Sequence, residues 1–376
     1  MGTQFPLLQL PADILEYLIM PLAKAAGARV IRSSSKVLCG AFDQMNTYLV
    51  IGGDPEEING GEALDHPDDV IVSLIHRTSH LRRLRIKTHV FRNSRARLEL
   101  PRCISLQHLD LPREGWAPLV SFFRGCRSSV KSVKLRTGIG DARTGQFWPS
   151  FQAWDALEDL SFRGSNAIDL SSLKLPPGLR RLQLGQCYRL RSLNALATCS
   201  SLESLSLAVG LSSSFDLGSI SVLAPSLTSL DISYMGMNAA DSVNIQPLEF
   251  LSHLTRLDFS TTPSDTVVAR TELRLARLSA ALNSLALTHC KISDFVPLHG
   301  CKSLRTLDLM LCSLDDRGIA SLCGCTQLSI LEMSMVDIVG GGGGVPCSPS
   351  GYASRFGPLR DAGVAIRDFS YSDLVA

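Results

Sequence analysis

The residues of this sequence with the greatest chemical potential are its eleven cysteines and eight histidines. Thiolate and imidazole groups bind zinc, or act as nucleophile and base, when they recur at short and fixed spacings. The nearest approach to such a pair is Cys323-Gly-Cys325, but one spacer residue and no matching histidine do not make a zinc site. The histidines are scattered without the spacing of metal ligands. We therefore expect no metal.

Other catalytic signatures are also missing from the sequence. It contains no HExxH, no G-x-S-x-G and no P-loop motif. The five consecutive glycines at 340–344 lack the strand–loop–helix context and the following Lys of a phosphate-binding loop, so they predict a flexible linker. The sequence predicts a protein that is not an enzyme and binds no cofactor.

A repeated pattern, L-x-x-L-x-L with conservative replacements, must position any functional residues of the chain. Eleven copies follow one another at intervals of 22 to 28 residues. The first residues of the copies are Leu81, Leu106, Val130, Leu157, Leu179, Leu202, Leu227, Leu254, Leu282, Leu304 and Leu328. Each copy alternates apolar and polar residues, which predicts a short strand buried on one face. Parallel stacking of the copies would close a continuous core.

This pattern resembles the leucine-rich-repeat family over residues 76–339. The resemblance implies an α/β fold, a solenoid whose curved parallel sheet has about eleven repeats. The stretches C-x-I-S-D from Cys290 and CSLDDRGIASLCGCTQL from Cys312 look like its cysteine-containing subclass. In the second stretch, Asp315 or Asp316 is expected to cap a short helix whose Ile319 and Leu322 turn inward.

Seven of the eleven cysteines fall at two fixed positions of the repeat. Four lie three residues before the first Leu of a copy (Cys103, Cys199, Cys301 and Cys325), and three lie eight residues after it (Cys187, Cys290 and Cys312). A disulfide framework or a metal site is the alternative, but the odd count and the absence of CxxC favour buried packing.

Strand alternation also predicts the binding surface. Residues two, four and six past the first Leu should point away from the core, onto the concave surface. The candidate contacts in early copies are Arg83, Arg85, Lys87, Lys134, Arg136, Arg163 and Arg181, and those in late copies are Asp231, Asp258 and Asp308. We expect a protein partner that is acidic where it meets the early repeats. Solvated surface charge is the alternative. Nucleic acid is not an expected partner, because no aromatic residues interleave the cations.

The N-terminal residues differ from the repeats. The combination of L-P-x-D-I-L-x-x-L from Leu10 and a later S-K-x-L is similar to an F-box, the module that binds the linker subunit of SCF ubiquitin ligases. That resemblance implies contacts through Leu10, Pro11, Ile14 and Leu18, and a substrate-receptor function. The alternative is a helical cap that shields the open end of the solenoid.

Composition and charge set the remaining expectations. The 45% apolar and 19% charged residues describe an ordered chain, and a formal charge of +2 gives no argument for nucleic acid. No apolar run is long enough for a membrane span, and no signal peptide or N-glycosylation sequon is found, so we expect an intracellular, cytoplasmic protein, with the nucleus as an alternative.

Three regions follow from these patterns. Residues 1–75 form the cap or F-box-like module with an acidic loop, 76–339 the solenoid, and 340–376 a Gly-rich linker and tail. Residues 136–150 are expected to form a protruding loop and 260–281 to include a surface helix with Leu273, Leu278 and Leu282 on one side. The tail 352–376 is expected either to dock as a cap or to be mobile.

Overall fold

The structure is a computed structural model. It describes residues 48–51, 81–86, 105–111, 123–136, 150–163, 170, 174–185, 190, 193–210, 217–237, 242–263, 271–274, 278–292, 294–334, 336–339 and 356–369. The chain divides into two units, 1–135 and 136–376. Among the described residues, no helix is long and apolar enough to cross a membrane.

The described part of the first unit contains four parallel strands, of which the last three come from the first three repeats. They are β1 (Tyr48–Ile51), β2 (Arg83–Ile86), β3 (His108–Leu111) and β4 (Ser132–Arg136), with a 3₁₀ helix, η2 (Phe123–Cys126), before β4. Leu84 pairs in register with Leu109, which pairs with Val133, and all three side chains are buried. β1 pairs with β2, so a strand of this sheet lies within the region expected to be the cap. The predicted contacts Leu10, Pro11, Ile14 and Leu18 lie outside the described residues.

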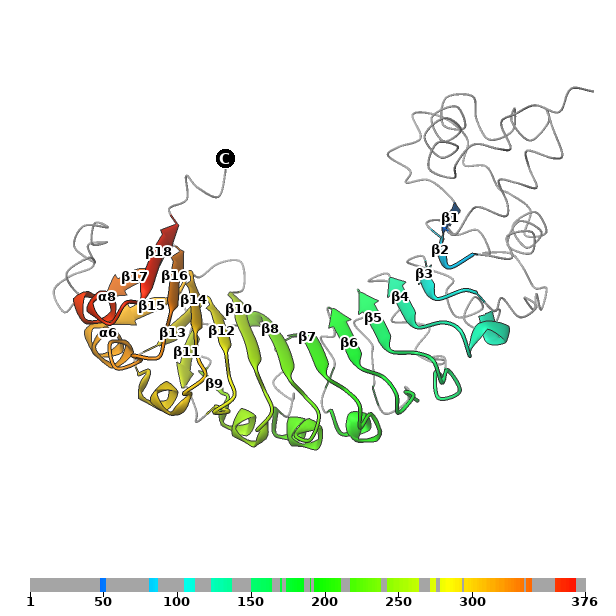
Figure 1. Ribbon diagram of the computed structural model, residues 1–376, viewed down its shortest axis with the longest axis horizontal. Helices are drawn as coiled ribbons and strands as arrows, with labels where there is room; N and C mark the ends of the chain where they lie inside the picture. The colour runs from blue at the N-terminus through cyan, green and yellow to red at the C-terminus, as the bar shows by residue number, and fades with distance from the viewer. Residues whose placement is uncertain are drawn as a thin grey trace, which may run out of the picture. The chain divides into compact units, whose positions relative to one another are not determined.

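The second unit continues the same plan in a row of strands that pair side by side (Figure 1). Its strands are β5 (Asp159–Arg163), β6 (Arg181–Gly185), β7 (Ser204–Gly210), β8 (Ser229–Met237), β10 (Arg256–Pro263), β12 (Ser284–Thr288), β14 (Thr306–Met310), β16 (Ile330–Ser334) and β18 (Ala365–Phe369). All the register pairs described within this row are parallel, as the repeat predicted. This unit is a leucine-rich-repeat solenoid, and we call its row of strands the main sheet.

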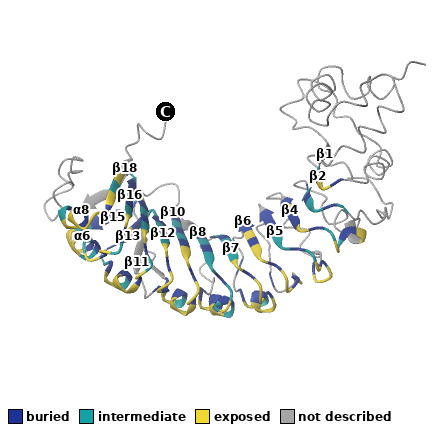
Figure 2. Cartoon of the chain, viewed as in Figure 1, coloured by how far each residue is buried: buried dark blue, intermediate teal, exposed yellow. Residues whose placement is uncertain are grey.

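The core of the second unit is a stack of equivalent side chains. Leu257, Leu285 and Leu307 are in register on β10, β12 and β14, and all three are fully buried. Figure 2 shows buried residues interspersed with more exposed ones along the strands of the main sheet. Phe151 and Trp154 begin the stack with an edge-on contact between ring centroids 5.4 Å apart. Each coil buries its apolar side only against its neighbours, so no single coil has a core of its own.

Short 3₁₀ helices precede several main-sheet strands. They are η4 (Asn194–Thr198), η5 (Leu217–Leu223), η6 (Gln246–Phe250) and η7 (Val296–Gly300). Each places at least one buried residue under the sheet, such as Leu196 and Leu248. In Figure 1 these turns line the lower edge of the row. They explain why Cys199 and Cys301, which follow η4 and η7 directly, are buried free thiols.

A second parallel sheet, which the repeat pattern did not predict, covers the other side of the core in the C-terminal coils. Its strands run in the order β17 (Asp337–Val339), β15 (Ser313–Asp315), β13 (Cys290–Ile292), β11 (Thr271–Arg274) and β9 (Ser242–Asn244). Cys290 and Ile292 point inward while Lys291 is exposed. Residues His289 and Leu311 form the corners before β13 and shortly before β15 with φ of 58° and 55°, a left-handed conformation that turns the chain sharply.

The prediction of a surface helix within 260–281 is wrong. Thr271–Arg274 is a strand that pairs with β9 and β13, and Leu278 and Leu282 are buried beside the main sheet. Neighbouring strands on both sides offer backbone partners that outweigh a weak helical pattern. The protruding loop expected at 136–150 lies almost entirely outside the described residues.

The helix expected after Cys312 is confirmed. It is α6 (Asp316–Leu322), and Asp315 caps it by accepting a hydrogen bond from the Gly318 amide at 2.7 Å. Ile319 and Leu322 are buried, as their spacing predicted. Gly318 lies where the helix meets β13. A Cβ atom at this position would come within 2.6 Å of the Ile292 carbonyl oxygen.

The tail adds a further coil. After the short helix α8 (Gly357–Asp361), β18 pairs in parallel with β16, so this segment docks onto the solenoid. Leu359 is fully buried and Val364 nearly so. The docking alternative therefore holds for residues 356–369.

A backbone ladder crosses the coils where the main strands begin. The amides of Thr228 and Ser229 both donate to the Glu203 carbonyl, at 2.9 and 3.0 Å. The same double bond recurs one coil later, where Thr255 and Arg256 donate to the Thr228 carbonyl. We call this column of carbonyls the carbonyl spine. Its amide bonds fix the register of one coil on the next, and the Thr228 and Thr255 hydroxyls donate to the same two carbonyls.

Candidate functional site

The side of the main sheet that points away from the core is the surface on which the sequence placed its candidate contacts. We call it the open sheet face. On each strand of the second unit, the alternation that buries the leucines brings two or three other side chains to this face. From β8 to β16 it carries Ser229, Asp231, Ser233, Arg256, Asp258, Ser260, Ser284, Ala286, Thr288, Thr306, Asp308, Met310, Ile330, Glu332 and Ser334.

The predicted basic contacts are divided between the two units of the chain. Arg83, Arg85 and Lys134 belong to the first unit, and Arg181 belongs to the second. Arg85 forms an ion pair with Asp110 at 3.2 Å. Of the other three predicted cations, Lys87 lies outside the described residues, and Arg136 and Arg163 are described only by their backbone.

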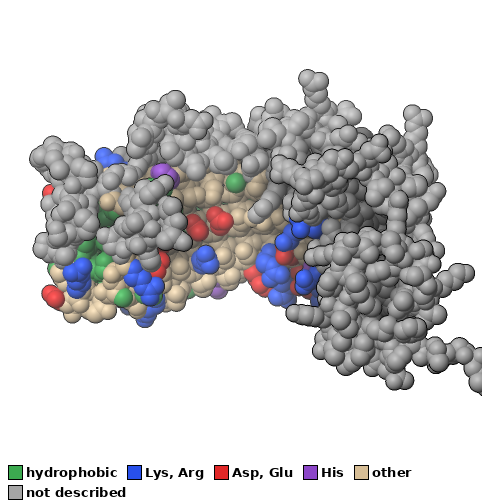
Figure 3. Space-filling model, turned by 90° about the horizontal axis from the view of Figure 1, so that it is seen from above, with side chains coloured by type: hydrophobic (Ala, Val, Ile, Leu, Met, Phe, Trp, Pro, Cys, Tyr) green, Lys and Arg blue, Asp and Glu red, His purple; other side chains and the backbone are tan. Residues whose placement is uncertain are grey.

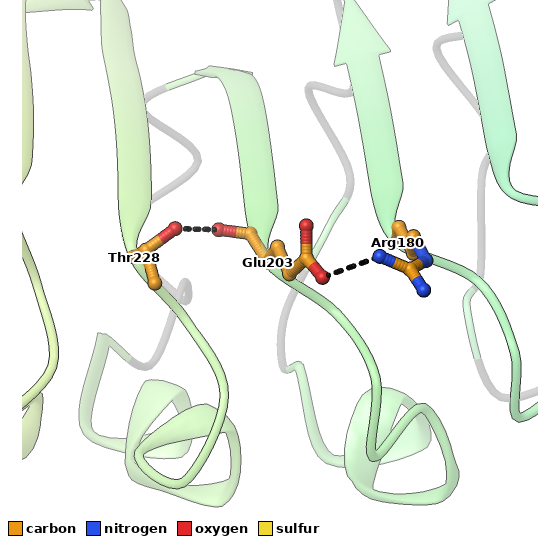
Figure 4. Close-up of polar contacts among 3 residues, drawn as sticks. All are labelled: Arg180, Glu203 and Thr228. Carbon is orange, nitrogen blue, oxygen red and sulfur yellow. Dashed lines mark hydrogen bonds and ion pairs between the residues drawn. The ribbon is translucent and has the colours of Figure 1, made fainter.

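The ion pairs at the start of the second unit also match cations with acids. Arg181 lies 3.5 Å from the carboxylate of Asp159 on the neighbouring strand. At the strand starts, Arg180 pairs with Glu203 at 3.0 Å, and the Thr228 hydroxyl donates to the Glu203 carbonyl (Figure 4). Both side chains of the Arg180–Glu203 pair are about half exposed, so the pair adds little stability. Figure 3 likewise shows acidic and basic side chains interspersed on a largely neutral surface.

The predicted acidic contacts do come together. Asp231 and Asp258 are directly opposite each other in the register of β8 and β10. Ala286 on β12 follows, and Asp308 on β14 and Glu332 on β16 continue the same row. We call Asp231, Asp258, Asp308 and Glu332 the acidic row. Its members share one position of the repeat, four residues after the first Leu.

The ends of the acidic row have partners. The Ser206 hydroxyl donates to Asp231 at 2.9 Å. At the other end, Arg367 on β18 pairs with Glu332 at 3.0 Å. Sequence reasoning missed Arg367 because its coil lacks the leucine pattern, although the alternation in Ala365-Ile366-Arg367 gave a weak signal.

The middle of the row is different, because no hydrogen bond or ion pair joins Asp258 or Asp308 to another described residue. Burial raises the pKa of Asp258, repulsion from Asp231 raises it further, and Arg256 partly offsets both effects. Burial also raises the pKa of Asp308, and the charges of Glu332 and Asp258 add to the effect. The two carboxylates therefore sense each other across Ala286, and the fold holds them at an electrostatic cost.

Other polar groups of this face bond across strands. The Ser260 hydroxyl donates to that of Ser233 at 2.7 Å, and the Ser161 hydroxyl donates to the Gln183 side-chain oxygen at 3.0 Å. Beside the acidic row, Met310 is 37% exposed. The face thus combines cross-strand hydroxyl bonds, an exposed thioether and two carboxylates that form no ion pair with a described residue.

The described thiols are poor candidates for chemistry. Burial raises the pKa of the Cys199 and Cys301 thiols, and it raises that of Cys325 to about 12, with Cys301 and Cys323 adding to the shift. The Sγ atoms of Cys290 and Cys312 donate to backbone carbonyls at 3.3 and 3.2 Å. Within the described segments, no three His, Cys, Asp or Glu side chains gather as a metal site.

No protein-family model matches the chain, and no curated protein matches its sequence. Among solved structures, it is similar to an internalin from Listeria monocytogenes, at 17% identity over 78% of this chain and 82% of that one, with a TM-score of 0.39. It is also similar to an internalin C2 from the same organism, at 19% identity over 50% of this chain and 77% of that one, with a TM-score of 0.32. The leucine-rich-repeat fold of this chain is evident in its sequence repeat and in the parallel register of its strands.

Proposed function

We propose that this chain is a non-catalytic protein-interaction scaffold that holds a partner against the open sheet face of its second unit. The observation that carries the proposal is the middle of the acidic row, where burial and neighbouring acids raise the pKa of Asp258 and Asp308. Arg256 offsets this effect only partly at Asp258, and neither carboxylate forms an ion pair with a described residue. Packing alone would favour neutral residues at these two positions. A binding surface, in contrast, gains on-rate and specificity from charges that a partner complements.

The breadth of the face supports a macromolecular partner. It extends over the five strands from β8 to β16, whose neighbours lie about 4.8 Å apart, so the acidic row is roughly 19 Å long. The Ser260 hydroxyl bonds to that of Ser233, and most other side chains of these strands on this face are small and polar. The catalytic motifs missing from the sequence agree with a binding function.

The test is to block the face and ask whether binding is lost. Thr288→Trp places a bulky side chain on the open sheet face, and Glu249→Trp places the same side chain on η6, which lies away from it. Proteins captured from a cell extract by the wild type should be lost with Thr288→Trp and retained with Glu249→Trp. If both variants retain the same proteins, the open sheet face is not the binding surface.

A partner that is acidic where it meets the early repeats remains a prediction, since it depends on Arg83, Lys134 and other cations of which only some are described. The ion pairs of Arg85 and Arg181 reduce the free positive charge available to such a partner. An intracellular, cytoplasmic location also remains a prediction from the sequence.

The alternative function is an F-box-type substrate receptor, which rests on the motif from Leu10 to Leu18. Co-expression with the linker subunit of the ligase should then yield a stable complex. The double substitution Pro11→Ala and Ile14→Ala should abolish it. A complex that survives both substitutions would remove the support that the motif gives to this function.

A further inference from the structure

The open sheet face has a gap in its acidic row at β12. The three face residues of this strand, Ser284, Ala286 and Thr288, all have small side chains. Asp258 and Asp308 flank Ala286 in register on the two neighbouring strands. Adjacent strands lie about 4.8 Å apart, so the two aspartates are roughly 10 Å apart at their Cα atoms. We call Asp258, Ala286 and Asp308 the carboxylate notch.

The notch differs from the ends of the row in its charge balance. Asp231 accepts a hydrogen bond from Ser206, and Glu332 pairs with Arg367. The notch carboxylates have no such hydrogen bond or ion pair among the described residues, and both are half-buried. Arg256, on the same strand as Asp258, offsets the repulsion at that carboxylate only partly. A cation between them would relieve the mutual repulsion and gain two charge-assisted hydrogen bonds.

The spacing favours a side-chain cation over a metal ion. A metal needs several oxygen ligands at 2.0 to 2.6 Å, roughly, and the described residues gather no group of three metal-binding side chains. A guanidinium carries donors on opposite edges, so it can donate to both carboxylates from a position above Ala286. The aliphatic stem of an arginine or lysine can pack on Met310, the exposed apolar residue of β14.

We propose that the open sheet face binds an extended basic segment of another protein, which places one arginine or lysine in the carboxylate notch. This inference rests on the proposed function and names the chemistry of the partner. The acidic row is roughly 19 Å long, which an extended segment of about six residues spans. Cations at alternate positions of such a segment would lie near Asp231 and Asp258 on one side of β12 and near Asp308 on its other side.

A defined probe tests the notch. A fluorescent, terminally blocked hexapeptide of alternating arginine and serine should bind the full chain at low ionic strength, as measured by anisotropy. The same peptide with citrulline in place of arginine keeps the size and loses the charge, so it should bind at least about tenfold more weakly. Binding should weaken as salt is added, because exposed charges are screened within about 10 Å at 0.1 M salt.

Matched variants separate the notch from general attraction. Asp258→Asn with Asp308→Asn should weaken arginine-peptide binding by about tenfold. Glu249→Gln with Asp361→Asn removes the same charge from exposed positions outside the face and should leave binding unchanged. An equal loss in both double variants, or equal binding of the citrulline peptide, overturns the proposal.

A self-occupied notch gives a second measurement. Ala286→Arg should place the chain's own guanidinium between the aspartates, abolish peptide binding and raise the melting temperature. Ala286→Gln has a long neutral side chain and should not raise it. If Ala286→Arg leaves both binding and melting unchanged, the notch holds no cation.

The outcomes also distinguish this inference from the proposed function. A natural partner that is lost with Thr288→Trp but binds the double asparagine variant normally would leave the open sheet face as the binding surface and refute the notch. A partner that is unaffected by Thr288→Trp would refute the proposed function itself.

Discussion

Leu307→Ala tests the stacked core at the centre of the C-terminal coils. Leu307 is fully buried on β14, in register with the fully buried Leu285 and Leu331 on the neighbouring strands. The substitution removes three carbon atoms, worth about 0.8 kcal/mol each in transfer, and leaves a cavity between two rigid neighbours. We expect a loss of about 3 to 4 kcal/mol in the free energy of unfolding, within the usual range for buried leucines.

The location of the loss matters as much as its size. Coils contact only their neighbours, so protection against hydrogen exchange should fall first in β12, β14 and β16 and remain in β6 and β7. Urea unfolding followed by circular dichroism gives the total, and hydrogen exchange with mass spectrometry gives the location. Thr306→Ala, on the open face of the same strand, is the control and should cost less than about 1 kcal/mol. A loss below about 1 kcal/mol for Leu307→Ala, or a uniform fall in protection, would refute the stacked-core account.

Three further predictions concern charge, backbone and thiols. Because Asp258 and Asp308 have pKa values raised in the folded state, that state binds protons more tightly than the unfolded chain. Stability should therefore rise as pH falls from neutral towards the ordinary aspartate range. Changing both residues to Asn should flatten this rise in urea titrations at several pH values. Gly318→Ala should destabilise the chain by about 1 to 3 kcal/mol despite the better helix propensity of alanine, since its Cβ would meet a backbone oxygen at 2.6 Å. Gly357→Ala, with open space around it, should be neutral or stabilising in thermal melts. Cys325, buried and with its pKa raised to about 12, should react with a thiol reagent at pH 8 only as fast as the coil opens; rapid labelling of the native protein at this residue would contradict its burial.

The main sheet could be predicted from the sequence because its signal repeats. Leu257, Leu285 and Leu307 recur at one position of the pattern, and the structure stacks them in register. The last coil was missed for a physical reason. Gly363 and Asp368 stand where the pattern has its first and third leucines, so only Ile366 carries the apolar signal.

The second sheet was beyond sequence reasoning. Its strands are three or four residues long, which is too short for a period of two to emerge, and stacking of the coils decides their pairing. The segment at Thr271–Arg274 shows the consequence, since its helical pattern yields to strand partners on both sides. Local propensity is a weak guide where tertiary pairing is available.

The candidate site was predicted in its parts and not in its arrangement. Alternation placed Asp231, Asp258 and Asp308 on one face, and the structure agrees. Which acid lies opposite which residue depends on the register between coils of 22 to 28 residues, and no single coil encodes it. The ion pairs of the predicted cations, such as Arg85 with Asp110, depend on register in the same way.

The carbonyl spine bears on how such a chain can change in length. Its amide bonds, such as those from Thr228 and Ser229 to the Glu203 carbonyl, join backbone atoms of successive coils, and a threonine hydroxyl adds to them in two coils. Duplication or deletion of one entire coil in the gene would therefore present the next coil with the same acceptor and donors as before. Loss or gain of a few residues where a main strand begins would instead move its amides away from the carbonyl of the preceding coil. Inherited changes in length are thus expected either as whole coils or in the stretches between the strands, where the spine is not interrupted.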